Sequence, residues 1–364
     1  MWRRWRPDIV AALPGWIVAR FLVATARIAS HALASQAHVA VGRRTTGLLA
    51  WDAGWYAAIA RHGYDALPRE GLRFFPLFPL LARVLAVPLG GRTDLAVILL
   101  ANACALLLGA LVHRLVSRET GDAPLARRAA WLVALLPPSY VLVLGYSEAL
   151  AGVLAVGVFL CIRRRRWLPA AALGVLAGLT RPVGVLLVVP VSIAAVMRVT
   201  ESSWGERLQR LVAVCAPALG CGAYLWWVQR EYGDALLPLR IQATGRLRGD
   251  VTSPVQSLWR SAQAALDGHL GDAMHLPWAL LAVALVIVAV RRWPPPYGGH
   301  AAITWLATYS AASLDSAERY VFGSVALVLA AAGLLRRPVT LVLAASGVVM
   351  TIYATAAFLN RVVP

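Results

Sequence analysis

The sequence predicts an all-α polytopic membrane protein with about eleven transmembrane helices. The chain is 60% hydrophobic, and its mean hydropathy is +0.67. Only 14% of its residues are charged, whereas about a quarter are charged in an average soluble domain. Long apolar stretches recur along most of the chain, and a segment in lipid must satisfy its own backbone hydrogen bonds, as a helix does. These observations exclude a soluble fold, and we expect residues 1–364 to form a single integral membrane domain.

The individual spans follow from the apolar stretches between charged or proline-rich connections. Several stretches are shorter than the ~20 residues that a straight span needs. Their boundaries are therefore approximate, and neighbouring stretches can merge into one span. The predicted spans are 9–31, 94–116, 129–145, 148–162, 167–180, 183–197, 210–229, 276–290, 300–314, 320–335 and 338–358.

Arginine sets the predicted orientation. The formal net charge is +18, and the chain has no lysine, so all 35 basic residues are arginine. Codon bias in a GC-rich genome explains this usage and indicates a bacterial protein. Basic residues favour the cytoplasmic side of a membrane. With a cytoplasmic N-terminus, every predicted inside connection is basic, the C-terminus lies outside, and two long segments, 36–93 and 230–275, are extracytoplasmic. No soluble module interleaves aromatic and basic residues, so we expect no nucleic-acid partner.

The first span has two interpretations. Arg20 and Arg27 interrupt it, and Ala32-Leu33-Ala34 resembles the small-residue cleavage site of a signal peptide. Arg20 would break the apolar core of such a peptide, which favours a membrane anchor. Either interpretation leaves residues 36–93 outside.

The first outer segment contains the strongest functional candidate. Asp52 lies in the run from Trp51 to Tyr64, whose spacing predicts a helix with Trp51 and Trp55 on one face. Such a helix can lie at the membrane interface with its indoles at headgroup depth. A carboxylate held there can take a proton from a hydroxyl group. The alternative is an amphipathic anchor whose aspartate only faces water. The proline-rich run 73–81 predicts a second interfacial or re-entrant piece.

Several motifs resemble the PIG-V-type mannosyltransferases, the GPI mannosyltransferase II family. The first is the run from Trp51 to Tyr64, and the resemblance extends in order over most of the chain. The further motifs are Phe74-Phe75-Pro76-Leu77-Phe78-Pro79-Leu80, Pro137-Pro138-Ser139, Tyr146-Ser147-Glu148-Ala149-Leu150, Leu179-Thr180-Arg181-Pro182-Val183-Gly184, Tyr232-Gly233-Asp234-Ala235 with Gln242, and Ser316-Ala317-Glu318-Arg319-Tyr320.

This resemblance implies a fold and a reaction. Such enzymes are similar to the wider GT-C class, so it implies a GT-C-like helix bundle with a catalytic acid in the first outer loop. It also implies a polyprenyl-phosphate-linked donor, usually of mannose, inversion at the anomeric carbon, and thus a polyprenyl-phosphate-mannose-dependent alpha-mannosyltransferase. A PIG-V enzyme adds mannose to a GPI precursor. This chain is shorter than eukaryotic members and has a bacterial composition, so its acceptor stays open among lipid, glycan and protein.

The remaining candidate residues lie at predicted outer helix ends or in the outer loops. Arginine binds phosphate bidentately, which indicates a donor-phosphate role for Arg181, Arg319 and Arg240, the last of these in a basic cluster with Arg246 and Arg248. The alternative is interfacial snorkelling. The candidates for sugar or acceptor binding are Trp51, Trp55, Tyr56, Tyr64, Tyr146, Glu148 and Gln242. Interfacial packing of the aromatic rings and a Glu148–Arg181 ion pair are the alternatives.

The predicted reaction requires neither a metal nor a cofactor. Arginines can meet the leaving phosphate, and Asp52 has no metal-ligand partner at a recognised spacing. Asp65 or Glu70 could complete a metal site, which is the less favoured interpretation.

Two other function classes compete with a glycosyltransferase. A transporter or flippase for lipid-linked sugars or lipids would show pseudo-repeats, and the sequence has none. A membrane scaffold would not need Asp52 beside Trp51. The predicted location is the cell membrane, with the active site on its extracytoplasmic side.

Overall fold

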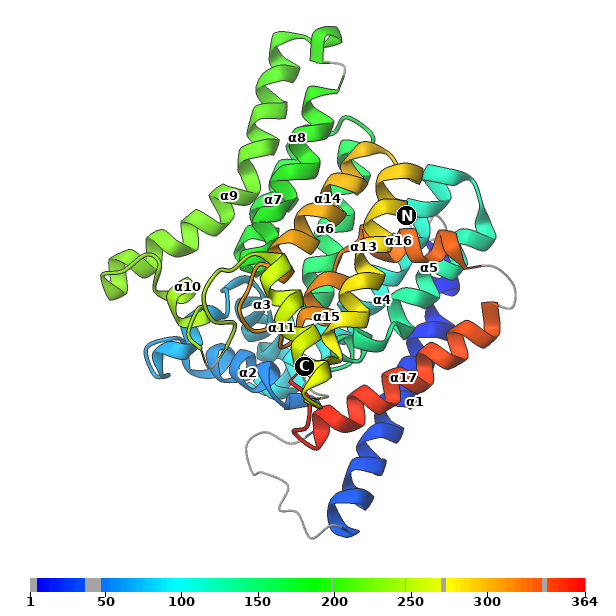
Figure 1. Cartoon of the computed structure of the whole chain (residues 1–364). Helices are drawn as coiled ribbons and strands as arrows, with labels where there is room; N and C mark the ends of the chain where they lie inside the picture. The colour runs from blue at the N-terminus through cyan, green and yellow to red at the C-terminus, as the bar shows by residue number, and fades with distance from the viewer. Residues whose placement is uncertain are drawn as a thin grey trace. The chain divides into compact units, whose positions relative to one another are not determined.

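The computed structural model describes residues 5–36, 47–197, 199–245, 247–269, 273–335 and 339–363. These residues form helices joined by turns, with one isolated bridge between Val251 and Ala311 (Figure 1). The all-α prediction is confirmed for this part of the chain. Its contacts divide it into two compact units. Unit 1 comprises Met1–Leu67, Phe78–Val153 and Ala331–Pro364, and unit 2 comprises Pro68–Leu77 and Leu154–Ala330.

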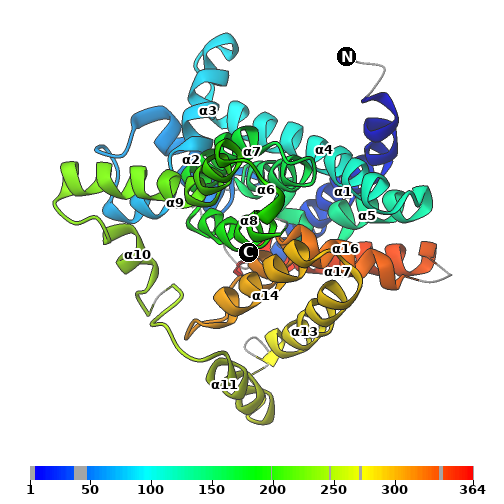
Figure 2. The same cartoon turned by 90° about the horizontal axis from the view of Figure 1, so that it is seen from above.

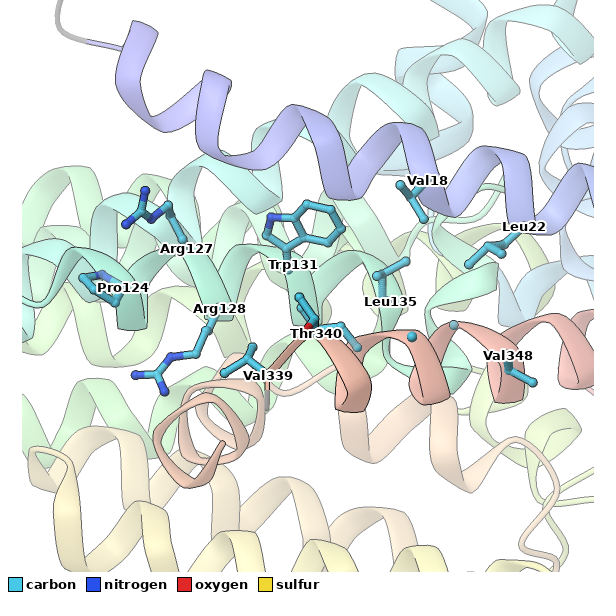
Figure 3. A pocket seen from close by; sticks show the side chains of 13 residues that line it. Val18, Leu22, Pro124, Arg127, Arg128, Trp131, Leu135, Val339, Thr340 and Val348 are labelled. Carbon is cyan, nitrogen blue, oxygen red and sulfur yellow. The ribbon is translucent and has the colours of Figure 1, made fainter. Parts of the chain in front are cut away.

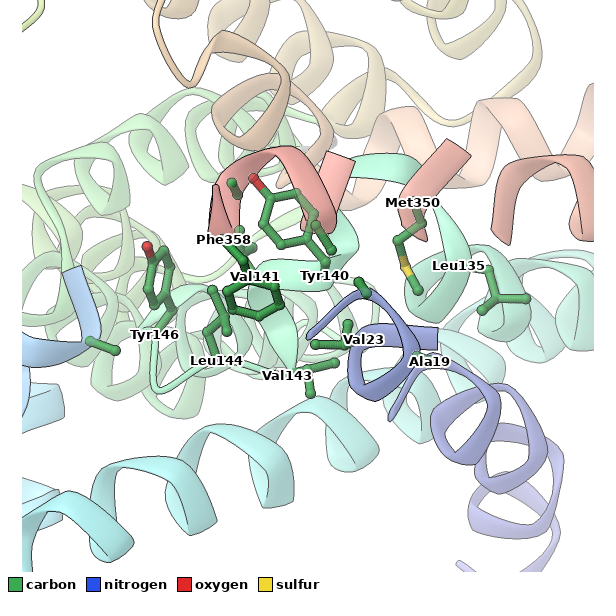
Figure 4. Close-up of a cluster of buried hydrophobic side chains, with 14 residues drawn as sticks. Ala19, Val23, Leu135, Tyr140, Val141, Val143, Leu144, Tyr146, Met350 and Phe358 are labelled. Carbon is green, nitrogen blue, oxygen red and sulfur yellow. The ribbon is translucent and has the colours of Figure 1, made fainter. Parts of the chain in front are cut away.

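Unit 1 is built on four packed helices. The helices α1, α4, α5 and α17 enclose its apolar core, and α1 and α17 run side by side (Figures 1 and 2). Figure 4 shows the main core cluster, in which Tyr140, Leu144 and Met350 are buried. The helices of this unit are α1 (Arg6–Gln36), α2 (Asp52–His62), α3 (Leu77–Ala86), α4 (Thr93–Thr120), α5 (Ala123–Leu135), the first part of α6 (Glu148–Ile162), the end of α16 (Val325–Leu334) and α17 (Val339–Phe358).

The polar residues inside α1 are satisfied by other parts of unit 1. The Arg20 guanidinium donates to the Asn102 side chain at 2.9 Å and to the Leu142 carbonyl. Near the start of α1, buried Asp8 pairs with His113 at 2.8 Å and with Arg114 at 2.6 Å, both on α4. A membrane helix tolerates charges that are paired in this way. The choice between an anchor and a cleaved signal peptide for the first span stays a prediction.

Unit 2 contains a closely packed helix pair, α7 and α9. A Cβ atom at Gly178 of α7 would lie 2.2 Å from the Pro217 carbonyl oxygen, and one at Gly220 of α9 would lie 2.0 Å from the Val175 carbonyl oxygen. Glycine lets the two backbones approach, as is common between membrane helices. The helices of this unit are the rest of α6, α7 (Trp167–Thr180), α8 (Val188–Val196), α9 (Trp204–Tyr232), α10 (Leu237–Gln242), α11 (Pro254–Leu266), α13 (His275–Arg292), α14 (Pro295–Tyr309), α15 (Ala317–Phe322) and the first part of α16.

Short 3-10 helices join these elements. In unit 2, η3 lies beside α10, and the Tyr224 hydroxyl of α9 donates to the Leu72 carbonyl at 2.7 Å. The 3-10 helices are η2 (Gly47–Leu49), η3 (Arg69–Arg73), η4 (Val87–Leu89), η5 (Pro137–Leu142), η6 (Pro182–Leu187) and η7 (Val199–Glu201).

Several predicted spans differ from the observed helices, and the span 210–229 begins six residues after the start of α9. The span 129–145 is wrong as one helix, because α5 ends before Pro137-Pro138 and η5 follows. The span 300–314 begins too late, because α14 starts at Pro295, where proline is well tolerated in a first turn. The span 320–335 divides into α15 and α16 at Gly323 and Ser324. Hydropathy alone does not register these local breaks.

Five described helices are long and apolar enough to cross a membrane: Arg6–Ser35, Thr93–Thr120, Trp204–Tyr232, His275–Arg292 and Val339–Phe358. Five shorter apolar helical segments accompany them, at Leu77–Leu89, Glu148–Ile162, Trp167–Thr180, Pro182–Val196 and Val325–Leu334. The count of about eleven spans and the interfacial placement of α2 and α3 stay predictions. The single membrane domain also stays a prediction, because the contacts divide the described chain into two compact units.

Candidate active site

Asp52 is the first residue of α2, and a strained residue precedes it. Trp51 has φ 56° and ψ −124°. Residues other than glycine rarely adopt this backbone conformation, which costs about 1–3 kcal/mol of conformational energy. The Trp51 indole donates to the Ala357 carbonyl at 3.2 Å and packs against the core of unit 1. This anchoring fixes the backbone turn that presents Asp52, whose side chain is partly buried.

The segment before α6 holds α2 through two tyrosine hydroxyls. The Tyr146 hydroxyl accepts from the backbone N–H of Asp52 at 3.3 Å, and the Tyr56 hydroxyl lies 2.7 Å from the Ser147 hydroxyl. Tyr146 and Ser147 are buried. Gly145, just before them, allows this approach, because a Cβ there would lie 2.5 Å from the Val97 side chain. Two motifs far apart in the sequence are thus brought together around Asp52.

The buried face of α2 is not the predicted indole face. It consists of Ala53, Tyr56, Ile59 and Ala60, a spacing of three and four residues that points to one side of a helix. Small residues at positions 53 and 60 let α2 pack closely, so the tryptophans do not decide which side is buried. Tyr56 also meets Phe78 edge-on at 4.9 Å.

The predicted sugar-binding residues of unit 1 have different surroundings. Tyr56 and Tyr146 are 3% and 1% exposed, so both rings are covered by protein, and we assign them a positioning role for α2 instead. Trp51 also makes core contacts rather than presenting an open face. Trp55 and Tyr64 are partly exposed, as is Glu148, which begins α6 next to Ser147. These three keep their predicted roles.

Unit 2 gathers three arginines around one aromatic ring. The guanidinium carbons of Arg181, Arg248 and Arg319 lie 5.4, 4.7 and 4.9 Å from the centre of the Tyr320 ring. Arg319 also donates to the Tyr320 hydroxyl at 3.2 Å. Arg181 and Arg319 are buried, and Arg248 is partly buried. We call Arg181, Arg248 and Arg319 the arginine cluster. Sequence reasoning named two of its members as phosphate ligands.

The loop that carries Arg248 is fixed by backbone contacts near α14. Arg248 donates to the Thr308 carbonyl, and its own carbonyl accepts from Ser313 at 2.8 Å. Gly249 has φ +66°, and a Cβ there would lie 2.9 Å from Ala312. A side chain at position 249 would therefore be strained and crowded.

A second strained residue precedes Arg319. Ser316 has φ 63° and ψ 12° immediately before α15, in the left-handed region that favours glycine. Strained backbone clusters at functional sites. Asp52 and Arg319 thus have the same local setting. Each lies at the start of a short helix that follows a residue with strained backbone, Trp51 or Ser316.

The electrostatics of unit 2 favour an anion at the arginine cluster. Burial lowers the pKa of Arg248; Tyr320 opposes this shift and the positive charge of Arg319 adds to it. Glu318 is buried and pairs with His275, because the His275 Nδ1 lies 2.6 Å from the Glu318 carboxylate. Glu318 is therefore not free to neutralise the arginine cluster. The buried Tyr309 hydroxyl, which follows Thr308, has no hydrogen-bond partner among the described residues. Crowded guanidinium groups gain stability when an anion binds between them.

Arg240 and Gln242 lie near this loop but make other contacts. Arg240 is exposed and pairs with Asp234 at 2.8 Å, a surface ion pair. The Gln242 backbone carbonyl accepts from the Arg248 backbone N–H at 3.1 Å. The sugar- or acceptor-binding role of the Gln242 side chain stays a prediction. Arg246 lies outside the described residues. The predicted Glu148–Arg181 ion pair joins residues of different units and stays a prediction.

No three side chains of His, Cys, Asp or Glu gather as a metal-binding group within the described ranges. Asp65 and Glu70, the predicted alternative ligands, belong to different units. The absence of a metal requirement stays a prediction.

Comparison with known proteins identifies the family. Residues 21–216 match the family model described as Mannosyltransferase (PIG-V), which is more than half of the chain. The chain belongs to the PIG-V mannosyltransferase family. The matched region contains Asp52, Tyr146 and Arg181 and ends before Arg248 and Arg319. The resemblance found in the sequence is thereby confirmed, and together with the apolar helices it makes the chain a multi-pass membrane protein.

Among solved structures, the chain is similar to the oligosaccharyltransferase of Archaeoglobus fulgidus in complex with Zn and sulfate. The TM-score is 0.43 and the sequence identity 14%, over 80% of this chain and 45% of the archaeal chain. The chain therefore spans less than half the length of that protein. No curated protein matches it. The GT-C-like arrangement of the helices stays a prediction.

Proposed function

We propose that this PIG-V family member is an inverting alpha-mannosyltransferase. It moves mannose from a polyprenyl-phosphate-mannose donor to an acceptor that is a lipid, a glycan or a protein. The observation that supports the proposal most is Asp52, which lies inside the family match and is presented by the strained Trp51 and by Tyr146. Family membership does not favour the transporter alternative.

Asp52 acts as the general base. It accepts the proton of the acceptor hydroxyl as that oxygen bonds to the anomeric carbon of the sugar. The bond from this carbon to the phosphate oxygen breaks on the opposite face, so the configuration inverts. The polyprenyl phosphate leaves with the electron pair and needs no proton, because it is stable as an anion.

The arginine cluster binds the phosphate of the donor. Guanidinium groups match phosphate oxygens in geometry and charge. As the bond to the sugar breaks, negative charge grows on the phosphate, and preorganised cations stabilise it most at that stage. Tyr320 holds the three guanidinium groups by its ring and hydroxyl. Trp55, Tyr64 and Glu148 are the candidates for sugar contact.

The proposed location is the cell membrane, with the N-terminus in the cytoplasm and Asp52 on the extracytoplasmic side. Arginine distribution along the sequence supports this orientation. A lipid-linked donor suits such a site, because its isoprenoid chain stays in the bilayer while the sugar reaches the interface.

The test is mannose transfer from radiolabelled polyprenyl-phosphate-mannose in membranes that contain equal amounts of each variant. We expect Asp52→Asn to lower transfer by about 10²- to 10⁴-fold, the usual contribution of a general base. Asp65→Asn is the matched control, because Asp65 is an exposed aspartate that follows the same helix, and it should retain transfer. Equal transfer by the wild type and Asp52→Asn would exclude Asp52 as the base. No transfer by the wild type would contradict the proposed donor.

A further inference from the structure

Unit 1 contains a groove that the proposed reaction does not use. It is a cavity of about 750 Å³ between α1, α5 and α17, which we call the α1–α5–α17 groove. Ligand pockets commonly have volumes of about 300–1,000 Å³. Figure 3 shows Arg127, Arg128 and Pro124 at one end of the groove and Leu22 and Val348 at the other.

The groove is apolar along its length and cationic at one end. Its walls between the ends are formed by side chains such as Val18, Trp131 and Leu343. Arg127 is exposed. Arg128 donates to the Leu335 carbonyl, and its buried Nε has no hydrogen-bond partner among the described residues. A buried donor without a partner is costly, and the exposed Arg127 beside it is open to an anionic oxygen.

The length of the groove matches one membrane leaflet. It follows α5 from Pro124 to Leu135 and α17 from Val339 to Val348, which at 1.5 Å per residue is about 14–17 Å. Half of a hydrocarbon core is about 15 Å. A lipid chain of one leaflet therefore fits along the groove when its headgroup lies at the arginine end.

The shape of the groove favours an acyl chain over a protein helix, whose diameter is about 10 Å. A flexible hydrocarbon chain needs less width and adapts to an irregular apolar wall.

We propose that the α1–α5–α17 groove binds an anionic glycerophospholipid, with one acyl chain in the groove and its phosphate at Arg127 and Arg128. The charge of the two arginines selects an anionic headgroup, and guanidinium groups bind phosphate oxygens bidentately. Arg127 and Arg128 belong to a predicted cytoplasmic connection, and anionic lipids of the cytoplasmic leaflet attract such basic residues. This inference does not depend on the proposed transferase reaction.

The test is photo-crosslinking with lipids of defined headgroup. The purified full-length protein is placed in phosphatidylcholine nanodiscs that contain a small fraction of phosphatidylglycerol with a photoactivatable acyl chain. Mass spectrometry then locates the label. We expect it on α5 and α17, and we expect unlabelled phosphatidylglycerol to displace it while added phosphatidylcholine does not.

Three variants sharpen the test. Arg127→Gln together with Arg128→Gln should lower labelling by about fivefold or more, since each basic residue near an anionic lipid contributes measurably to binding. Ala344→Trp should fill the groove and block labelling without removing charge. Arg164→Gln with Arg166→Gln is the control, because both arginines are exposed, lie in another predicted cytoplasmic connection and do not line the groove.

Two results would overturn the proposal. Equal labelling by photoactivatable phosphatidylcholine that survives the arginine changes would mean that the groove holds acyl chains without reading the headgroup. No label on α5 or α17 from either lipid would mean that the groove holds no lipid. If the double arginine variant does not fold, Arg127→Gln alone and Ala344→Trp test the same proposal. Arg127 is exposed, so its substitution should not disturb folding. None of these readouts requires mannose transfer.

Discussion

At the scale of single residues, two arginines of the same loop region have different surroundings. Arg240 forms a surface ion pair, whereas Arg248 belongs to the proposed phosphate site. Arg240 is exposed and already bound to Asp234, whereas Arg248 is partly buried beside Tyr320 and two other arginines. A hydrogen bond to a charged group contributes about 1.5–3 kcal/mol. We therefore expect Arg248→Gln to weaken donor use by about 10- to 100-fold, measured as kcat/KM with varied donor.

Arg240→Gln provides the matched comparison, since an exposed ion pair contributes at most about 1 kcal/mol. It should change donor use little. A larger effect from Arg240→Gln than from Arg248→Gln would contradict the assignment of the arginine cluster and favour the donor-phosphate role that the sequence indicated for Arg240.

Tyr146 should act through Asp52 rather than on the sugar. Its ring is buried, and its hydroxyl accepts from the Asp52 backbone N–H. Tyr146→Phe removes this acceptor, and the loss of about 0.5–1.5 kcal/mol in positioning should lower kcat about two- to tenfold. The donor KM should stay constant, because no sugar contact is lost. A raised KM with unchanged kcat would instead support the sugar-binding role.

The sequence was informative about individual residues where chemistry is local. Asp52, Arg181 and Arg319 were predicted from their residue types and from the resemblance, and the structure places both arginines at Tyr320. The position of Arg248 in the arginine cluster depends on contacts with α14 and α15. These helices are distant from Arg248 in the sequence. The burial of Tyr56 and Tyr146 was not predictable either, because it follows from the close approach of Gly145 to Val97.

At the scale of elements, the α7–α9 pair should depend on the position of each glycine. A Cβ at Gly220 would lie 2.0 Å from the Val175 carbonyl oxygen, whereas Gly222 on the same helix has no atom within 4 Å. Gly220→Ala must push two backbones apart, at a cost of about 1–3 kcal/mol. We expect it to lower the Tm of the purified protein by several degrees in thermal unfolding.

Gly222→Ala is the internal control, because alanine favours a helix over glycine by about 1 kcal/mol. It should leave the Tm unchanged or raise it. Equal losses from the two changes would indicate that glycine matters here through backbone flexibility and not through helix contact.

Helix boundaries were predictable where charge or proline delimits an apolar run. The predicted spans 148–162 and 167–180 coincide with α6 and α7, since the run Arg163 to Arg166 separates them. The breaks at Pro137 and at Gly323 lie inside apolar runs, so a hydropathy average passes over them. Local backbone chemistry, not hydrophobicity, decides these boundaries.

At the scale of the molecule, the two ends of α4 contact different helices of unit 1. One end carries Asp8 and Arg114, where the start of α1 meets the end of α4. At the other end of α4, Asp94 and Thr93 contact Arg61 of α2, the helix that begins at Asp52. This separation agrees with a topology in which Asp52 lies on the opposite side of the membrane from the first residues of α1.

Cysteine labelling tests this orientation. In a variant whose four cysteines are replaced, Asp65→Cys and Arg164→Cys each introduce one exposed thiol. The predicted spans 94–116, 129–145 and 148–162 lie between the two positions, and an odd number of crossings puts them on opposite sides. We expect a membrane-impermeant maleimide to label position 65 in intact cells and position 164 only after permeabilisation. The reverse pattern would put Asp52 in the cytoplasm and contradict an extracytoplasmic reaction. Labelling of both in intact cells would mean an even number of crossings, with either α5 and η5 failing to span or the segment Leu77–Leu89 spanning as well.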